Sequence, residues 1–346
     1  VEYLIDEGAF INVKNKEQGY TELHIAATMG FTDIVNLLIE EGADAGLRDN
    51  ENKTAFDLAM YYGHRNIGYT LLASGAPDDQ LASYLNAPGE MDVPVAYGEA
   101  KVWFLGHSSW AIKTQNNFLV FDYFCNAWDR KPDDSCLASG YIIPEMLAGQ
   151  NVTVFSTHAH GDHYQPFIFD WKEANPDINY VLCWNQDTEG HEYTQIPIHG
   201  EKKIGEMEIY AHYSTDLGGG YLVEIDGVSI LHMGDHANGE DGLMPEFTAE
   251  IDMIQERGAE IDILFGGIRG CSLGQPEQVK RGIYYTLETL QPELFVPMHC
   301  GGHSTDYKEF VETAKNDGIN VNMKYVTNKG DRFMYKKQSK GEVSSL

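Results

Sequence analysis

Three histidines and one aspartate fall within the six positions from His158 to His163, in the stretch STHAHGDHY. The apolar segment 152–155 runs directly into this stretch, so the cluster follows a predicted buried strand. A carboxylate placed there is costly unless a cation compensates its charge. Imidazole and carboxylate ligands together suit zinc, manganese or iron. The cluster therefore predicts a metal site at a strand end, and the fold must bring further ligands to that end.

The spacing of these four residues divides them between two ions. Side chains at positions i and i+2 of extended backbone share a face, so His158 and His160 can bind one ion. Gly161 allows the chain to turn sharply. Asp162 and His163 then point elsewhere and can reach a second ion.

Further ligands are expected at other strand ends, because six residues cannot complete two coordination spheres. His212, Asp235 and His299 each stand at the C-terminal end of an apolar segment. His191 and His199 lie in a loop bounded by glycine and proline, and we interpret them as surface residues.

Alternating and β-branched segments begin at about Tyr97 and predict strands within 101–114, 117–124, 151–157, 178–184, 207–214 and 294–299. Residues 220–235 predict a hairpin that turns at Asp226-Gly227. Helices are expected at 246–257 and 277–290. Strands mixed with helices in this way predict a layered domain with its sheets inside.

The N-terminal part carries an internal repeat. Gly-Ala pairs recur at steps of 34 and 33 residues, at Gly8, Gly42 and Gly75, and TELHIA at 21–26 corresponds to TAFDLA at 54–59. This pattern resembles the ankyrin repeat, with one full and two partial copies in residues 1–76, followed by a linker at 77–97. Such an array binds a protein partner, mediates self-association or packs on the next domain.

The remaining motifs resemble the metallo-β-lactamase superfamily: H-x-H-x-D-H, a downstream histidine, a Gly-Asp after a strand and a late Pro-x-His. The opening GHSS hairpin and the stretch from IDILFGG to VPMH resemble its ascorbate-phosphate-lactonase-like branch. The resemblance implies an α+β fold, an αββα sandwich over 98–346, preceded by the short all-α ankyrin domain.

The resemblance also implies a binuclear hydrolase with two divalent ions, zinc first, with manganese or iron as alternatives. His158, His160 and His212 would hold one ion, Asp162, His163 and His299 the other, and Asp235 would bridge them. Two ions about 3.5–4 Å apart bring the pKa of a shared water near neutrality, so the bridging hydroxide would be the nucleophile, with Asp162 and Asp235 as catalytic residues.

Supporting roles fall to residues around these motifs. Candidates for the proton donor to the leaving group are His303, His236 and Tyr164, and candidates for substrate binding are Arg269 and His303. His107 is expected to form the rim of the site, and Asp122 to support the metal loop through hydrogen bonds.

Composition narrows the partners. The chain has 24 basic and 53 acidic residues, a net charge of −29, which disfavours nucleic acid and anionic membranes. No apolar run is long enough to predict a membrane span. Five cysteines without a C-x-x-C pair suggest reduced thiols in a cytoplasmic protein. A small ester, lactone or phosphorylated metabolite is the expected substrate.

Two other classes of protein compete with the hydrolase. The first is a non-catalytic, ankyrin-based interaction protein with a vestigial hydrolase-like domain; the seven filled ligand positions argue against it. The second is a di-iron redox protein, which would need a flavin or rubredoxin-like partner domain that the sequence does not reveal.

Overall fold

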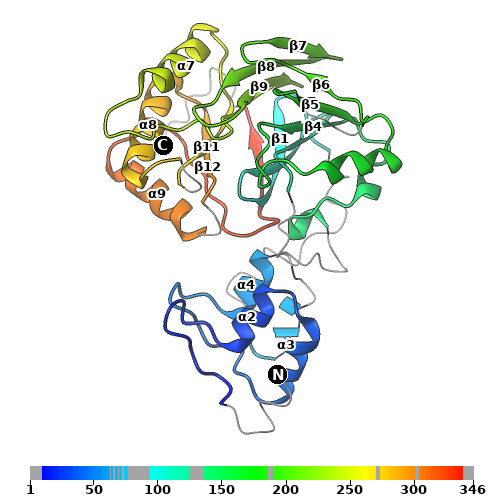
Figure 1. Ribbon diagram of the computed structural model, residues 1–346, viewed down its shortest axis with the longest axis vertical. Coiled ribbons are helices and arrows are strands. Elements are labelled where there is room, and N and C mark those ends of the chain that lie inside the picture. The colour runs from blue at the N-terminus through cyan, green and yellow to red at the C-terminus, as the bar shows by residue number, and fades with distance from the viewer. Residues whose placement is uncertain are drawn as a thin grey trace.

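A computed structural model of the chain describes residues 10–62, 64, 67–68, 70–71, 74–76, 94–124, 136–185, 190–269, 273–300 and 304–337. The repeat part, drawn in blue in Figure 1, includes helices α2 (Glu22–Thr28), α3 (Thr32–Glu40) and α4 (Ala55–Tyr61). Thr21 caps α2 by accepting a hydrogen bond from the backbone N–H of His24. Leu23, Val35 and Phe56 lie in one shared core, so neighbouring units stack as the repeat pattern predicts.

The larger domain contains two sheets that pack face to face. The first has the order β13-β1-β2-β3-β4-β5-β6. Its strands are β13 (Arg332–Lys336), β1 (Glu99–Gly106), β2 (Ser109–Lys113), β3 (Phe118–Phe121), β4 (Val152–Ser156), β5 (Asn179–Leu182) and β6 (Thr194–Gln195). The strands β3, β4 and β5 are parallel neighbours, so their C-terminal ends share one edge of the sheet.

The second sheet has the order β12-β11-β10-β9-β8-β7. Its strands are β12 (Leu294–Met298), β11 (Ile263–Gly267), β10 (Val228–His232), β9 (Gly219–Ile225), β8 (Met207–Tyr213) and β7 (Glu201–Ile204). The strands β10, β11 and β12 run parallel, so their C-terminal ends also meet at one edge.

Alternation along β1 shows how the first sheet divides two cores. Val102 and Phe104 face the core between the sheets, whereas Trp103 and Leu105 belong to a separate core on the other face. All four side chains are fully buried. The first sheet is therefore covered on both faces, which is what a sandwich with outer layers requires.

The outer layers complete the αββα arrangement. Helices α7 (Pro245–Glu256), α8 (Pro276–Leu290) and α9 (Ser304–Asn316), yellow to orange in Figure 1, lie on the second sheet. The described cover of the first sheet consists of 3-10 helices, η2 (Leu137–Ser139), η3 (Pro144–Leu147) and η4 (Pro166–Glu173). The α+β sandwich expected from the sequence is confirmed.

The β9–β10 hairpin fastens the two sheets at one end. Asp226 and Gly227 both have positive φ, +52° and +78°, as the predicted two-residue turn requires. The Asp226 carboxylate accepts hydrogen bonds from the Thr114 hydroxyl, from the backbone and side chain of Asn116, and from the Asn117 side chain. One side chain of the second sheet therefore holds the β2–β3 turn of the first.

A hydrogen bond also joins the repeat part to the larger domain: the Tyr141 hydroxyl donates to the Tyr62 carbonyl oxygen at 2.7 Å. The expected linker lies largely outside the described residues, which resume at 94. Within the described ranges no helix is both long and apolar enough to cross a bilayer.

Candidate metal centre

The predicted ligand residues converge where the parallel strands of both sheets end. The H-x-H-x-D-H loop follows β4, Asp235 follows β10 and His299 follows β12. The described residues form two groups with ligand atoms within 4.8 Å of one another: His107, Asp162, His163 and His299, and His158, His160, Asp216 and Asp235. The structure therefore brings together six of the seven ligand positions expected from the sequence, and it adds His107 and Asp216.

Asp235 lies at the centre of a buried floor. Its carboxylate is 3.3 Å from His163 Nε2, 3.2 Å from His299 Nε2 and 3.7 Å from His158 Nε2. These four side chains are at most 2% exposed. The carboxylate thus touches members of both groups, which is the position a bridging ligand needs.

Hydrogen bonds behind the floor fix each ring so that Nε2 faces inward. The Asp122 carboxylate accepts from His163 Nδ1 at 2.8 Å, and also from the backbone N–H and hydroxyl of Thr157. The Thr157 hydroxyl oxygen in turn lies 3.1 Å from His158 Nδ1. Because its proton is given to Asp122, this oxygen accepts the Nδ1 proton of His158. The support expected of Asp122 is therefore present, and His158 and His163 are held with Nε2 towards the centre, where it can bind a metal in its deprotonated form.

His299 is oriented in the same way by the backbone. Its Nδ1 donates to the carbonyl oxygen of Arg269 at 2.8 Å. The residue has φ of +63°, and Asp122 and His107 also have positive φ, +46° and +53°. Non-glycine residues rarely adopt this conformation, and it concentrates at functional sites.

The donor atoms left over fit a metal. Among the described residues, His163 Nε2, His299 Nε2, His107 Nε2 and Asp235 Oδ1 are buried polar atoms without a hydrogen-bond partner. Their contacts with the carboxylates of Asp235 and Asp162, at 3.2–3.3 Å, lack hydrogen-bond geometry. Buried polar atoms without hydrogen bonds are costly in a folded protein unless something satisfies them. They point at a shared space, and their mixed nitrogen and oxygen chemistry suits a divalent transition metal.

A more open rim surrounds the floor. The side chains of His160, Asp162 and Asp216 are 47%, 33% and 31% exposed. His160 Nδ1 lies 3.4 Å from the Asp216 carboxylate, and His107 Nε2 lies 3.3 Å from that of Asp162. Solvent therefore reaches the centre on this side.

Charges on the floor are strongly coupled. Burial alone would lower the pKa of His163, but the carboxylates of Asp235 and Asp122 outweigh it and raise the pKa to about 9. Burial opposes the ionisation of Asp235, yet His163 and His299 hold its pKa well below the usual range. Without metal, the floor therefore contains an anionic carboxylate paired with a protonated imidazole. A bound cation would displace the proton of that imidazole.

The local conformation of the histidine loop differs from the prediction. Strand β4 ends at Ser156, so His158 and His160 lie in a turn and not on extended backbone. The two rings still meet, with His158 Nε2 3.0 Å from His160 Nδ1. Gly161 is not among the described glycines with positive φ, and a Cβ there would meet no atom within 4 Å. The turn therefore does not depend on glycine at this position.

Several predicted site residues lie elsewhere. His212 is fully buried, with Nδ1 2.9 Å from the Tyr213 carbonyl oxygen and Nε2 3.2 Å from that of His232. His236 packs on Phe247, and burial lowers its pKa to about 3, so it is neutral and enclosed. Neither residue belongs to the two ligand groups of the described chain.

The candidates for substrate binding, Arg269 and His303, and the candidate proton donor Tyr164 have different outcomes. The Arg269 side chain pairs with Asp306 at 2.6 Å and is 47% exposed. Its carbonyl oxygen, not its guanidinium, supports the centre through His299. Tyr164 is buried beside Trp184, with ring centroids 5.5 Å apart. His303 lies outside the described residues.

The sequence reasoning missed Asp216, although one signal was available. Asp216 lies in the turn that joins β8 to β9, only four residues after His212. The choice of His212 rested on its position at the end of a strand, but the ligand group takes the carboxylate from the following turn.

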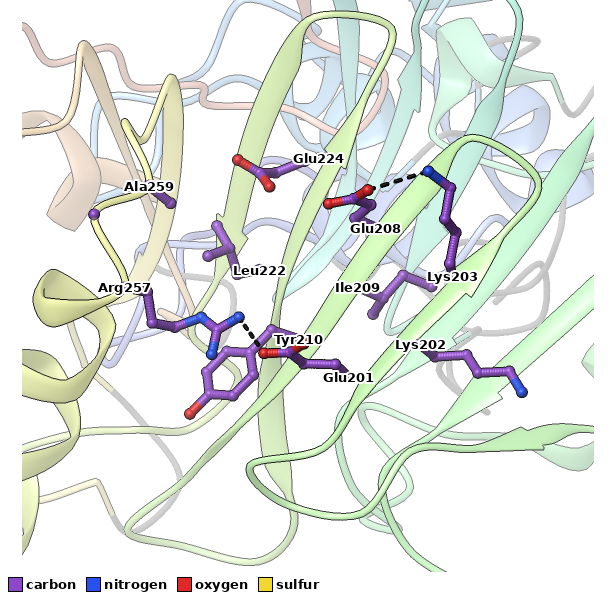
Figure 2. Close-up of a pocket in the computed structure, with 11 residues that line it drawn as sticks. Glu201, Lys202, Lys203, Glu208, Ile209, Tyr210, Leu222, Glu224, Arg257 and Ala259 are labelled. Atoms are coloured by element: carbon purple, nitrogen blue, oxygen red, sulfur yellow. Dashed lines mark hydrogen bonds and ion pairs between the residues drawn. The ribbon is translucent and has the colours of Figure 1, made fainter.

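A separate hollow of about 500 Å³ lies over β7, β8 and β9 (Figure 2). Figure 2 shows the Arg257 guanidinium over the Tyr210 ring, 3.8 Å from its centroid, and paired with Glu201 at 2.6 Å. Lys203 pairs with Glu208 at 3.1 Å. None of the candidate metal ligands among the described residues lines this hollow, and these charges already have partners, so the centre at the strand ends remains the candidate site.

Fold and ligand groups together define a metal-binding αββα protein, and comparison with known families agrees. The chain belongs to the family of the β-lactamase superfamily domain, whose model matches residues 101–299. Its N-terminal part, residues 1–80, matches three copies of the ankyrin repeat.

Individual proteins show the same division. Over 212 residues the chain is 26% identical to a UPF0173 metal-dependent hydrolase of Thermococcus onnurineus. The matched region covers 58% of this chain and 84% of that hydrolase. Over 59 residues it is 44% identical to the E3 ubiquitin-protein ligase hecd-1 of Caenorhabditis elegans, covering 17% of this chain and only 2% of the ligase. The solved structure of Igni18, a metallo hydrolase from Ignicoccus hospitalis, has a TM-score of 0.52 at 18% identity and covers 69% of this chain and 100% of Igni18, which shows a shared fold.

Proposed function

We propose that this chain is a binuclear metal-dependent hydrolase that acts on a small ester, lactone or phosphorylated metabolite. The observation that carries the proposal is the position of Asp235 between two groups of ligand-type side chains. Divalent ions held there would supply an activated water and polarise the carbonyl or phosphoryl group under attack.

The chain's own residues have separable tasks in this proposal. His158 and His160 hold one ion, and Asp162, His163 and His299 hold the other, with Asp235 shared. Asp122 and the Arg269 carbonyl keep the imidazole rings in the metal-binding tautomer. The buried floor excludes water from below, and the open rim admits substrate.

The orphaned buried atoms favour this proposal over a vestigial domain. A centre without function would be expected to lose or satisfy such atoms, because leaving them unpaired destabilises the fold. Net charge supports a small substrate, since the acidic surface repels polyanions.

The test is a hydrolysis screen of purified full-length protein reconstituted with zinc, manganese or iron(II). Lactones, esters, thioesters and phosphodiesters are offered, with elemental analysis of the same samples. We expect about two ions per chain and metal-dependent turnover in one class, both lost in Asp235→Ala. If metal is bound but none of the substrate classes is hydrolysed, the hydrolase proposal is rejected and the interaction protein is favoured.

We further propose that the ankyrin repeats bind a protein partner or a second copy of the chain, in a cytoplasmic setting. Phe10, Val13 and Ile25 are 85%, 55% and 47% exposed on this part. Cys183 is a free thiol, as in reducing compartments. Light scattering at increasing concentration tests self-association, and an unchanged monomer mass would leave only a different protein as partner.

A further inference from the structure

The third ligand of the ion at His158 and His160 is the point where family resemblance and geometry disagree. The resemblance assigns it to His212, but both ring nitrogens of that residue lie within 3.2 Å of backbone carbonyl oxygens. A Cβ added at Gly220 would lie only 2.2 Å from His212 Nε2, so the ring is enclosed by the neighbouring strand. His212 has neither a nitrogen turned to the centre nor room to turn one.

The Asp216 carboxylate is presented to the centre instead, 3.4 Å from His160 Nδ1. The turn that carries it is held on both sides. The Thr215 hydroxyl donates to the Ala237 carbonyl oxygen at 2.7 Å and accepts from the Ala237 N–H at 2.9 Å. This ties the turn to the segment that follows Asp235.

Gly218 fixes the other side of the turn. It has φ of +68°, and a Cβ there would lie 2.3 Å from the Thr157 carbonyl oxygen and 2.7 Å from His158 Cβ. The backbone N–H of Gly219 donates to that same carbonyl at 3.0 Å. The absence of a side chain at Gly218 therefore lets the turn approach the histidine loop closely enough for Asp216 to reach it.

We propose that Asp216, and not His212, is the third ligand of the ion at His158 and His160, and that this carboxylate reduces the advantage of zinc over manganese and iron. The inference rests on the two-ion centre proposed above. The second, independent observation is the set of orphaned buried atoms on the adjoining floor, which already points to bound cations.

Donor chemistry gives the direction of the effect. With His212 as ligand the first ion would have three imidazoles and the shared Asp235. With Asp216 it has two imidazoles and two carboxylates, which matches the set Asp162, His163, His299 and Asp235 proposed above for the second ion. Carboxylate oxygen favours manganese, and two histidines with a carboxylate are typical of non-haem iron, whereas additional imidazole favours zinc.

The experiment measures dissociation constants of zinc and of manganese on chelator-stripped full-length protein, by competition with a chromophoric chelator. Wild type is compared with Asp216→His, which restores a third imidazole, and with Asp216→Asn. His212→Gln is the matched control, a histidine four residues away that makes no contact with the centre. Thermal unfolding of each variant checks that it is folded.

We expect Asp216→His to change the manganese-to-zinc ratio of dissociation constants by at least about tenfold in favour of zinc. Asp216→Asn should weaken the binding of both metals at least about tenfold, since even an outer hydrogen-bond partner of a ligand contributes that much. His212→Gln should leave both constants within about twofold of wild type. An unchanged ratio of dissociation constants in Asp216→His, or loss of metal in folded His212→Gln, overturns the assignment of Asp216 as ligand but leaves the proposed hydrolase activity standing. Metal binding as expected, but without turnover in the hydrolysis screen, overturns only the proposed activity.

Discussion

A histidine of the repeat domain, His24, and the histidines of the candidate metal centre look alike in sequence but differ in how their ring nitrogens are used. His24 is buried in α2, with Nδ1 2.8 Å from the Thr21 hydroxyl and Nε2 3.3 Å from the Lys53 carbonyl oxygen. His163 and His299 are equally buried, but each satisfies only Nδ1 and leaves Nε2 without a hydrogen-bond partner. For these three residues, the buried Nε2 without a hydrogen-bond partner distinguishes the candidate ligands His163 and His299 from the structural His24.

Two further histidines of the larger domain can be compared with His24 in the same way. His232 donates or accepts at both nitrogens, with Nε2 2.9 Å from the Ser108 carbonyl oxygen and the Gly234 N–H directed at Nδ1. His212 has a carbonyl oxygen near each nitrogen. Both therefore resemble His24 more than they resemble His163.

The strongest test of the comparison removes the carboxylate that the free nitrogens share. Asp235→Asn should lower metal-dependent turnover by more than about 100-fold, because it weakens a direct ligand and not merely an outer partner. Metal content per chain and hydrolysis rate are measured together. Near-normal activity with normal metal content would show that Asp235 is not shared between the ions.

A smaller loss is expected when only the orientation of the rings is disturbed. Asp122→Asn keeps the shape of the side chain but weakens its acceptance from His163 Nδ1, so metal affinity should fall by about 10- to 100-fold. Competition with a chelator measures the change. If this variant binds metal as tightly as wild type, Asp122 does not orient His163 for metal binding.

The structural histidine should respond to pH rather than to metal. Burial lowers the pKa of His24, so the unfolded chain binds the proton more tightly than the folded repeats do. Its stabilising effect is complete above about pH 6.5, the unfolded value, and is lost as pH falls below it towards the folded pKa.

Optical probes can isolate the repeats in this measurement. All five tryptophans, the first at Trp103, lie in the larger domain, so their fluorescence does not report on the repeats. Far-ultraviolet circular dichroism records helix loss in both parts. As the pH is lowered, we expect the circular dichroism signal to show an unfolding transition at a higher pH than the tryptophan fluorescence does. The pH dependence of this dichroism transition should be weaker in His24→Gln. Identical pH dependence in the variant would exclude His24 as the cause.

The smallest effect is expected at Arg269, whose backbone and not its charge supports the centre. Arg269→Ala removes a surface ion pair with Asp306 and should lower the free energy of unfolding by less than about 1 kcal/mol. Metal affinity should be unchanged, because the carbonyl oxygen that accepts from His299 remains. Loss of metal in this variant would assign the guanidinium a larger role.

Sequence reasoning reached the fold and most of the floor because those residues follow apolar strands. His158, His163, Asp235 and His299 lie at strand ends, where periodicity and motif spacing both place them. Asp216 lies in a turn, whose approach depends on the missing side chain of Gly218 and on the bonds of Thr215. Such tertiary contacts leave no periodic pattern, and a histidine four residues earlier offered a more familiar ligand.

The distribution of the ligands along the chain also sets an order of events during synthesis. His158 and His299 are separated by roughly 140 residues, which a ribosome adds in roughly 7 to 28 seconds at about 5–20 residues per second. For that interval the H-x-H-x-D-H segment exists without His299, its partner at the end of β12. The proposed two-ion centre can therefore be completed only after His299 has been synthesised, and until then the cell's metal supply meets an incomplete binding segment.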